Sequence, residues 1–166
     1  MENQNARQVD LMYKLKEDNT SLIDTVLIFK TGQFYSAYDT DAEIIAFLNK
    51  YKIINKKGYQ TCGFPLKSLN KVIDKLDIEE INYKIYENIK TNKKAEKEKN
   101  FKINNRYQRV SNKASKNNEK QERVQKIKTT LDNIIELPYA KKIIEELEKE
   151  LQNIISKNRR KYEEEN

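Results

Sequence analysis

The residue types best suited to chemistry lie in one short stretch, Lys30–Ser36, which reads KTGQFYS. An aromatic ring that stands out from a surface offers a platform for any nucleobase, and such stacking contributes about 1–3 kcal/mol per base. Phe34 and Tyr35 are adjacent, so in a strand one ring can be buried while the other is exposed. Gly32 permits a bend, and Lys30 adds positive charge. The stretch therefore predicts nucleic-acid contact, with Phe34 as the stacking ring.

The acidic run at residues 39–43, DTDAE, is a second candidate for chemistry. Carboxylates of this kind hold magnesium in nucleases, and Asp41 would be the residue to test. The run also has the form of a capping box, with Thr40 as the N-cap and Glu43 three residues later. Acidic residues in the first turn of a helix stabilise its dipole without any ion. We therefore predict a capped helix here, and a nuclease is the least favoured function.

Other catalytic chemistry finds little support in the composition. The chain contains no His, the commonest general base and the usual zinc ligand. Its single cysteine, Cys62, cannot form an intrachain disulfide, which fits a reducing cytoplasmic setting. There is no GxxxxGK[ST] phosphate loop, no apolar run long enough for a membrane span and no signal-peptide pattern. We expect a cytoplasmic protein that is not an enzyme, with no catalytic residue, metal, cofactor or membrane contact.

Patterns on both sides of the aromatic stretch indicate the elements that position it. Val26–Phe29 is the densest apolar run and predicts a buried strand. After an opening helix, the order β, β, α, β, β, α, β predicts an α+β fold, a small mixed sheet with packed helices. Helices are expected at residues 6–18, about 40–49 and after Pro65, and the later strands at 51–54, 59–62 and 81–89, with a turn at 55–58.

The same landmarks carry a resemblance to a known family. The stretch Phe29–Ser36 is similar to the signature of the N-terminal mismatch-recognition domain (domain I) of the MutS family, an apolar strand, a basic residue and then Gly-Asp-Phe-Tyr-Glu. The similarity covers about residues 8 to 88, while the ATPase part of that family has no counterpart. Further matching segments, in the same order, are Tyr13–Lys16, Asp41–Ala42, Cys62–Pro65 and Tyr83–Glu87.

This resemblance implies a role in DNA repair as a stand-alone DNA-binding module. In the family, the Phe wedges beside the mispaired base and the Glu two residues later hydrogen-bonds to it, so Phe34 takes the wedge position. Ser36 stands in place of that Glu, and Gln33 replaces the Asp. Both exchanges remove negative charge that would repel phosphate. They favour general nucleic-acid contact over discrimination of mismatches, because a hydroxyl has no charge and a shorter reach.

Positive charge is concentrated in one tract of the chain. The formal net charge is +7, and Lys90–Thr130 holds fourteen Lys or Arg against four Glu, a net of +10. The tract contains few apolar residues, so we predict a flexible or marginally helical basic arm over residues 90–120 that follows a nucleic-acid backbone. Phe101 and Tyr107 would be available to stack on bases. A solvated linker without function remains the alternative.

The last part of the chain has heptad-like spacing of apolar residues on either side of Pro138, which predicts two helices broken at about residues 136–139. They would form a coiled-coil-like helical hairpin or a kinked rod. An apolar stripe must be covered, whether by the same chain, a second copy or a partner protein. The stripe consists of Val124, Ile127, Leu131, Ile134, Leu137, Ala140, Ile144, Leu147, Leu151 and Ile154.

The sequence thus predicts a MutS domain I-like part at residues 1–89, a basic flexible arm at 90–120 and an amphipathic helical extension at 121–166. The leading hypothesis is a non-catalytic accessory protein that binds DNA, with RNA or an RNA–DNA hybrid left open. The alternative is an adaptor whose residues 121–162 dock onto a second copy, a polymerase, a reverse transcriptase or a repair complex. The residues predicted to contact nucleic acid are Lys30, Gly32, Gln33, Phe34, Tyr35, Ser36, Lys93, Lys94, Phe101, Arg106, Tyr107 and Arg109.

Overall fold

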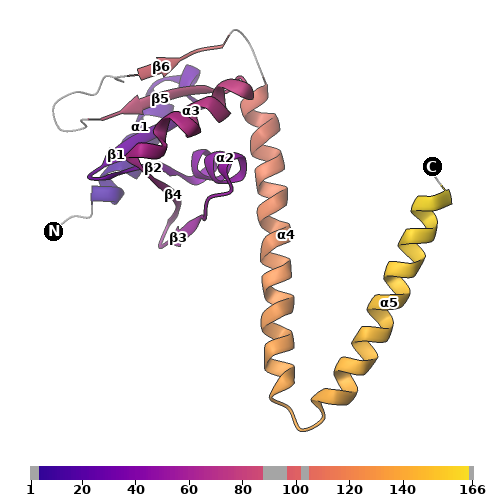
Figure 1. The fold of residues 1–166 in the computed structure, drawn as a ribbon. Coiled ribbons are helices and arrows are strands. Elements are labelled where there is room, and N and C mark those ends of the chain that lie inside the picture. Colours follow the sequence, from indigo (N-terminus) through magenta and orange to yellow (C-terminus); the bar gives the residue numbers. More distant parts are fainter. Residues whose placement is uncertain (1–3, 88–96, 102–104, 165–166) are drawn as a thin grey trace. The chain divides into compact units, whose positions relative to one another are not determined.

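A computed structural model of the chain describes residues 4–87, 97–101 and 105–164. The chain forms two compact units, residues 1–118 and 119–166, and the boundary falls inside helix α4 (Arg106–Ile135). Figure 1 shows the elements of both units. In chain order they are α1 (Gln4–Asp18), the 3-10 turn η1 (Thr20–Leu22), β1 (Thr25–Thr31), β2 (Phe34–Tyr38), α2 (Asp39–Asn49), β3 (Ile54–Lys56), β4 (Tyr59–Pro65), the 3-10 turn η2 (Leu66–Ser68), α3 (Leu69–Ile78), β5 (Asn82–Tyr86), β6 (Lys97–Lys99), α4 and α5 (Ala140–Glu164).

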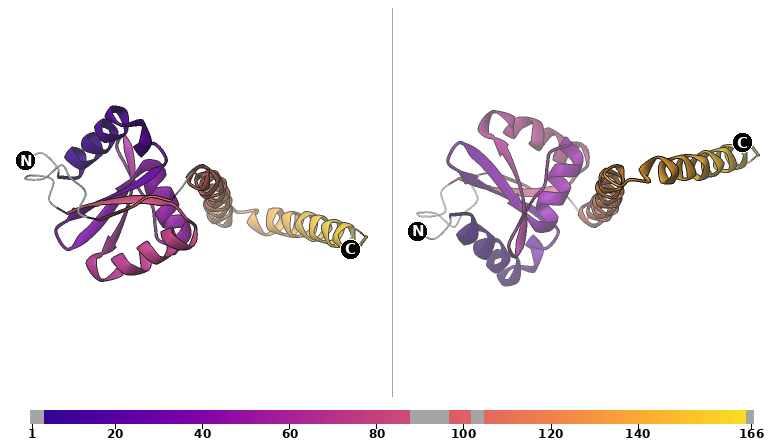
Figure 2. Two further views of the ribbon diagram at one scale, coloured as in Figure 1. Left: turned by 90° about the horizontal axis from the view of Figure 1, so that it is seen from above. Right: turned by 90° about the horizontal axis from the view of Figure 1, so that it is seen from below.

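The first unit is built on a six-stranded mixed sheet in the order β3-β4-β2-β1-β5-β6. β1 and β5 are parallel, and the other neighbouring pairs are antiparallel. Helix α1 covers one face of the sheet, and α2 and α3 cover the other (Figure 2). The predicted α+β fold, a mixed sheet with packed helices, is confirmed.

The central strand explains why the apolar run is continuous. Leu27 and Phe29 point toward α1, whereas Val26 and Ile28 belong to the core beneath α2 and α3, and all four are 0% exposed. A strand buried on both faces needs an uninterrupted apolar sequence instead of an alternating one. Burying each such side chain contributes about 1.5–3 kcal/mol.

The helix after β2 begins differently from the prediction. α2 starts at Asp39, Tyr38 is its N-cap residue and no side chain caps it, so the predicted capping box is wrong. The acidic side chains are engaged elsewhere, because the Asp39 carboxylate accepts the Gln60 backbone N–H at 2.8 Å and Asp41 is buried. Because the helix begins before Thr40, this residue lies inside the first turn and not at the N-cap position that the capping box requires.

The predicted flexible or marginally helical arm over residues 90–120 contains a strand and the start of a long helix where the structure describes it. Residues Lys97–Lys99 form β6, which pairs antiparallel with β5, and α4 begins at Arg106. The first turns of α4 bury Tyr107, Val110 and Ala114 against the first unit. These apolar residues are sparse but fall on one helical face, which is sufficient to dock the helix.

The break near Pro138 is confirmed. α4 ends at Ile135 and α5 begins at Ala140. Within the described part of the chain, no helix combines the length and the hydropathy that a bilayer-spanning segment requires.

Candidate nucleic-acid interface

Phe34 lies at the beginning of β2, directly after the tight turn that follows β1. Gly32 in this turn has a φ of +60°, a left-handed conformation that disfavours other residue types. The Phe34 ring is 52% exposed, and its neighbours on the adjoining strands are Thr31 and Pro65. Gln33, also exposed, accepts the Leu66 N–H through its carbonyl at 3.3 Å. The turn therefore presents an aromatic ring beside a proline at one end of the sheet.

The side chain of Gln8 holds this turn in place from helix α1. It is 1% exposed, and its Nε2 donates to the Lys30 carbonyl at 3.0 Å. Its Oε1 accepts hydrogen bonds from the Thr31 hydroxyl at 2.8 Å and the Tyr38 hydroxyl at 2.6 Å. With its polar groups satisfied in this way, the Gln8 side chain fixes the end of β1 and the turn that follows. Because this turn carries Phe34, the ring should lose less entropy when a base stacks on it.

Lys30 and Tyr35 point to the opposite face from Phe34. Lys30 Nζ lies 3.5 Å from Glu87 Oε2, and the Tyr35 hydroxyl donates to Glu87 Oε1 at 2.7 Å. The Tyr35 hydroxyl, with Lys30 adding to it, lowers the pKa of Glu87 and keeps this acid charged. Tyr35 is 3% exposed and stacks on Phe64, so the prediction that it contacts nucleic acid directly is wrong. The charge of Lys30 is partly offset by Glu87, which weakens it as a phosphate contact.

Ser36 lies on the same face as Phe34, two residues along β2. It is 7% exposed and pairs with Gly63 on β4. A Cβ added at residue 63 would lie 3.9 Å from Ser36 Oγ, in ordinary contact. Ser36 is therefore largely covered, and its hydroxyl reaches the surface far less than the Phe34 ring does.

Other predicted contact residues lie at the opposite end of the sheet, where β1 and β5 begin. The Phe101 N–H donates to Asn82 Oδ1 at 2.7 Å, and Lys99 Nζ lies 5.0 Å from the centre of the Phe101 ring. Arg106 forms an ion pair with Glu80 at 3.2 Å. The structure therefore does not bring Phe101 and Arg106 together with Phe34, which follows the far end of β1.

Tyr107 requires a correction. It is 3% exposed, and its hydroxyl donates to Asp41 Oδ1 at 2.6 Å, so it cannot stack on a base as predicted. The start of α4 turns Tyr107 and Val110 inward on the same helical face. Arg109 points to solvent and stays a predicted contact. Sequence composition gave no indication that an aromatic residue in a basic tract would belong to the core.

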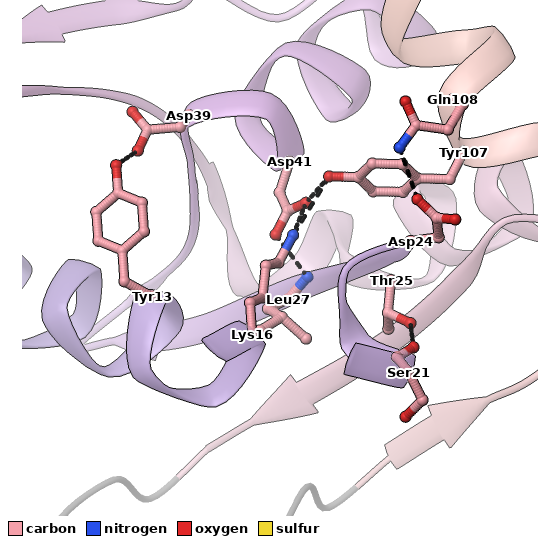
Figure 3. Close-up of polar contacts among 10 residues, drawn as sticks. All are labelled: Tyr13, Lys16, Ser21, Asp24, Thr25, Leu27, Asp39, Asp41, Tyr107 and Gln108. Carbon is pink, nitrogen blue, oxygen red and sulfur yellow. Dashed lines mark hydrogen bonds and ion pairs between the residues drawn. The ribbon is translucent and has the colours of Figure 1, made fainter. Parts of the chain in front are cut away.

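Asp41 joins three helices and the central strand (Figure 3). It is 0% exposed, its Oδ1 lies 2.7 Å from Lys16 Nζ and 2.6 Å from the Tyr107 hydroxyl, and its Oδ2 accepts the Leu27 N–H at 3.0 Å. Burial raises the pKa of Asp41, while Lys16 and the other donors act in the opposite direction. Both oxygens are occupied and inaccessible, which removes the basis for the nuclease hypothesis at this residue.

The other acids of the run also have structural partners. Asp39 accepts the Tyr13 hydroxyl, and this hydrogen bond is the main reason that the pKa of Tyr13 rises to about 12. Glu43 accepts the Ser115 hydroxyl at 2.9 Å. An open hollow of about 480 Å³ lies beside Asp39 and Glu43, with Tyr59 in its wall. Its lining includes two acids, Asp39 and Glu43, against one base, Lys56, so it has no positive charge excess to attract a phosphate backbone.

Lys93 and Lys94 lie outside the described residues. The chain enters that segment after Glu87, beside Lys30, and leaves it at Lys97, which pairs with Ile85. Because β5 and β6 are antiparallel neighbours, both ends of the segment lie at the end of the sheet that carries Phe34. Lys93 and Lys94 therefore stay predicted contacts.

Sequence reasoning missed two residues beside Phe34. Pro65 is exposed and is the cross-strand neighbour of Phe34, and Lys67 is exposed in the turn that follows. The segment Cys62–Pro65 was recognised as a landmark, but its position next to Phe34 depends on the pairing of β2 with β4. Nothing in the local sequence specifies which strand is the neighbour.

Comparisons with known proteins add one positive finding. The family model described as MutS domain I matches residues 11–158. This range is longer than the region of resemblance seen in the sequence and extends through α4 into α5. A search of curated proteins gives no significant match.

Proposed function

Because the chain belongs to the MutS domain I family, we propose that it is a non-catalytic accessory protein that binds DNA through Phe34. In MutS, domain I is the module that recognises mismatched DNA. The observation that carries the proposal is the 52% exposure of the Phe34 ring, at the position of the family wedge. An exposed aromatic ring on a firmly held turn can contact a partner with little loss of conformational entropy. Stacking between bases supplies that partner.

Phosphate contacts would come from the same end of the sheet. Lys67 is exposed two residues after Pro65, the cross-strand neighbour of Phe34. Lys93 and Lys94, which lie outside the described residues, remain predicted phosphate contacts. Phe101, Arg106 and Arg109 would join only a longer nucleic acid. The seven residues of β1 separate the two ends of the sheet by roughly 23 Å, given a rise of about 3.3 Å per residue.

Replacing Phe34 with Ala tests the proposal. We expect the dissociation constant for a mismatched duplex to rise by roughly 5-fold to 150-fold, because stacking on one ring contributes about 1–3 kcal/mol. Fluorescence anisotropy with mismatched, homoduplex and single-stranded oligonucleotides measures it. The matched control is Ile54→Ala, which removes an apolar side chain of similar exposure, 46%, from edge strand β3. Equal affinities for the wild type and Phe34→Ala would refute the proposal.

Restoring the family acid is expected to sharpen discrimination. Ser36→Glu places a carboxylate on the Phe34 face opposite Gly63, where it can accept a hydrogen bond from an unpaired base. Hydrogen bonds to charged groups contribute about 1.5–3 kcal/mol, so the ratio of mismatch to homoduplex affinity should rise about tenfold or more. Ser36→Gln, which has a similar shape and no charge, is the control. An identical ratio in all three proteins would contradict the assignment of residue 36.

The adaptor function is the second candidate, supported by apolar side chains that are exposed in α4 and α5, among them Ile127 at 61% and Leu151 at 55%. Residues 121–162 would then bind a partner protein or a second copy. Under this alternative, nucleic-acid affinity is low and insensitive to Phe34→Ala. The anisotropy experiment therefore separates the two functions.

A further inference from the structure

The second unit leaves a long apolar stripe uncovered. Its exposed side chains lie between 37% and 61% exposure, whereas the first unit buries most of its apolar residues in a core. A contiguous stripe of this kind marks an interaction surface. The residues are Val124, Ile127, Leu131, Ile135, Leu151, Ile154 and Ile155.

The spacing of the stripe fits antiparallel helices. The connection between α4 and α5 spans residues 136–139, and the apolar residues on its two sides are equally far in sequence from Tyr139, its last residue. An antiparallel return would place them in four layers and bring Lys128 close to Glu148. The layers are Ile134 with Ile144, Leu131 with Leu147, Ile127 with Leu151 and Val124 with Ile154.

The stripe is too wide for two helices. In a heptad repeat, whose seven positions are lettered a to g, the contact between two helices uses only positions a and d. Helices in a larger bundle are also apolar at a flanking position, e or g. In the assignment given by the four layers, Ile135 and Ile155 occupy e positions and Ile143 occupies a g position. A hairpin of α4 and α5 would leave these flanking isoleucines in water, and a second pair of helices would cover them.

The charge of the second unit favours a second copy of this chain as the source of that pair. Residues 119–166 contain eleven Lys or Arg and eleven Asp or Glu, so the whole net charge of +7 belongs to residues 1–118. A neutral unit with both signs interspersed does not repel its own copy and has no excess charge to attract a polyanion. We propose that two copies of this chain associate through residues 119–156 of α4 and α5 to form an antiparallel four-helix bundle.

The dimer would strengthen the binding of long nucleic acids. This effect rests on the proposed function of Phe34, whereas the dimer itself does not. Two Phe34 rings would be carried by one particle, so a nucleic acid long enough to reach both would be held more tightly than by either alone. Self-association itself requires no nucleic acid. It can therefore be tested separately from the Phe34 hypothesis.

The test is the mass of the full chain in solution by size-exclusion chromatography with light scattering, without nucleic acid, over roughly a hundredfold range of concentration. We expect twice the chain mass of 19.8 kDa for the wild type. The double variant Ile135→Lys with Ile155→Lys charges both flanking positions and should be monomeric. Circular dichroism checks that its helix content is retained.

The control adds the same two charges to the outer face, as Thr129→Lys with Ser156→Lys, and should remain a dimer. Both control residues are exposed in the structure. A wild-type chain that is monomeric at every concentration would overturn the proposal, since a closed hairpin or a different partner would then cover the stripe. A flank variant that stays dimeric with retained helix content would overturn it equally.

Discussion

Replacing Lys16 with Met is expected to lower the free energy of unfolding by about 3–5 kcal/mol at neutral pH. Lys16 Nζ lies 2.7 Å from Asp41 Oδ1, and the Asp41 side chain is 0% exposed. Met keeps the apolar stem of Lys16 but removes its charge. The carboxylate would then be buried without a cation, and the Tyr107 hydroxyl and the Leu27 N–H are neutral donors. Chemical denaturation followed by circular dichroism measures the loss.

The pH dependence of this loss provides a sharper test. Burial raises the pKa of Asp41 above its ordinary value of 3.8, so the folded protein holds the Asp41 proton to higher pH than the unfolded chain does. A group of this kind contributes stability at low pH that is lost as the pH rises through the folded pKa. Without Lys16 the shift should be larger. The difference in stability between wild type and Lys16→Met should therefore shrink as the pH falls from 7 toward 4.

The control for this experiment is Arg106→Met. Arg106 pairs with Glu80 at 3.2 Å, but the two side chains are 41% and 53% exposed. Exposed ion pairs contribute only about 0–1 kcal/mol, so this variant should be nearly as stable as the wild type. If both variants lost the same small amount, the buried contact with Asp41 would have no special role in stability.

The thiol of Cys62 is expected to be almost unreactive in the folded protein. Cys62 is 0% exposed on β4, opposite Ala37, and burial raises its pKa from 9.0 to about 12. The thiolate is the reactive form, so the pKa shift alone should lower the labelling rate roughly 1000-fold near pH 8. Loss of access lowers it further. Labelling should then follow the opening of the core beneath α2 and α3.

A disulfide-exchange reagent with an optical readout measures this rate. The reference is a Cys62→Ala protein that carries Ser156→Cys, because residue 156 is exposed on α5. The wild type should react at the rate of the reference only in denaturant. Comparable rates for both proteins under native conditions would mean that β4 is not part of a stable core.

Much of the fold could be predicted because its signals are local. The apolar run Val26–Phe29, the glycine in the following turn and the helical spacing after Pro65 each specify an element within a few residues. Pro138 marks the interruption between α4 and α5 in the same way. The exposure of Phe34 next to a buried Tyr35 follows from strand alternation.

The remaining features depend on contacts between residues far apart in sequence. Tyr107 is core because it meets Asp41, 66 residues earlier. β6 is a strand because β5 offers a free neighbour, although Lys97–Lys99 has a composition that suggests solvent. The charge of Lys30 is partly offset by Glu87, which parallel pairing of β1 and β5 places beside it. A single sequence does not specify these pairings. The prediction from sequence therefore placed too many of the contact residues on one surface.

The two outermost strands give the sheet protection against unwanted growth. β3 and β6 are three residues long and exposed throughout, and β6 consists only of charged residues, Lys97, Glu98 and Lys99. Edge strands of three residues offer few unpaired backbone groups to an incoming strand of another molecule. The charges of β6 further disfavour such pairing at that edge. The sheet is therefore a poor template for aggregation, even though its centre is strongly apolar.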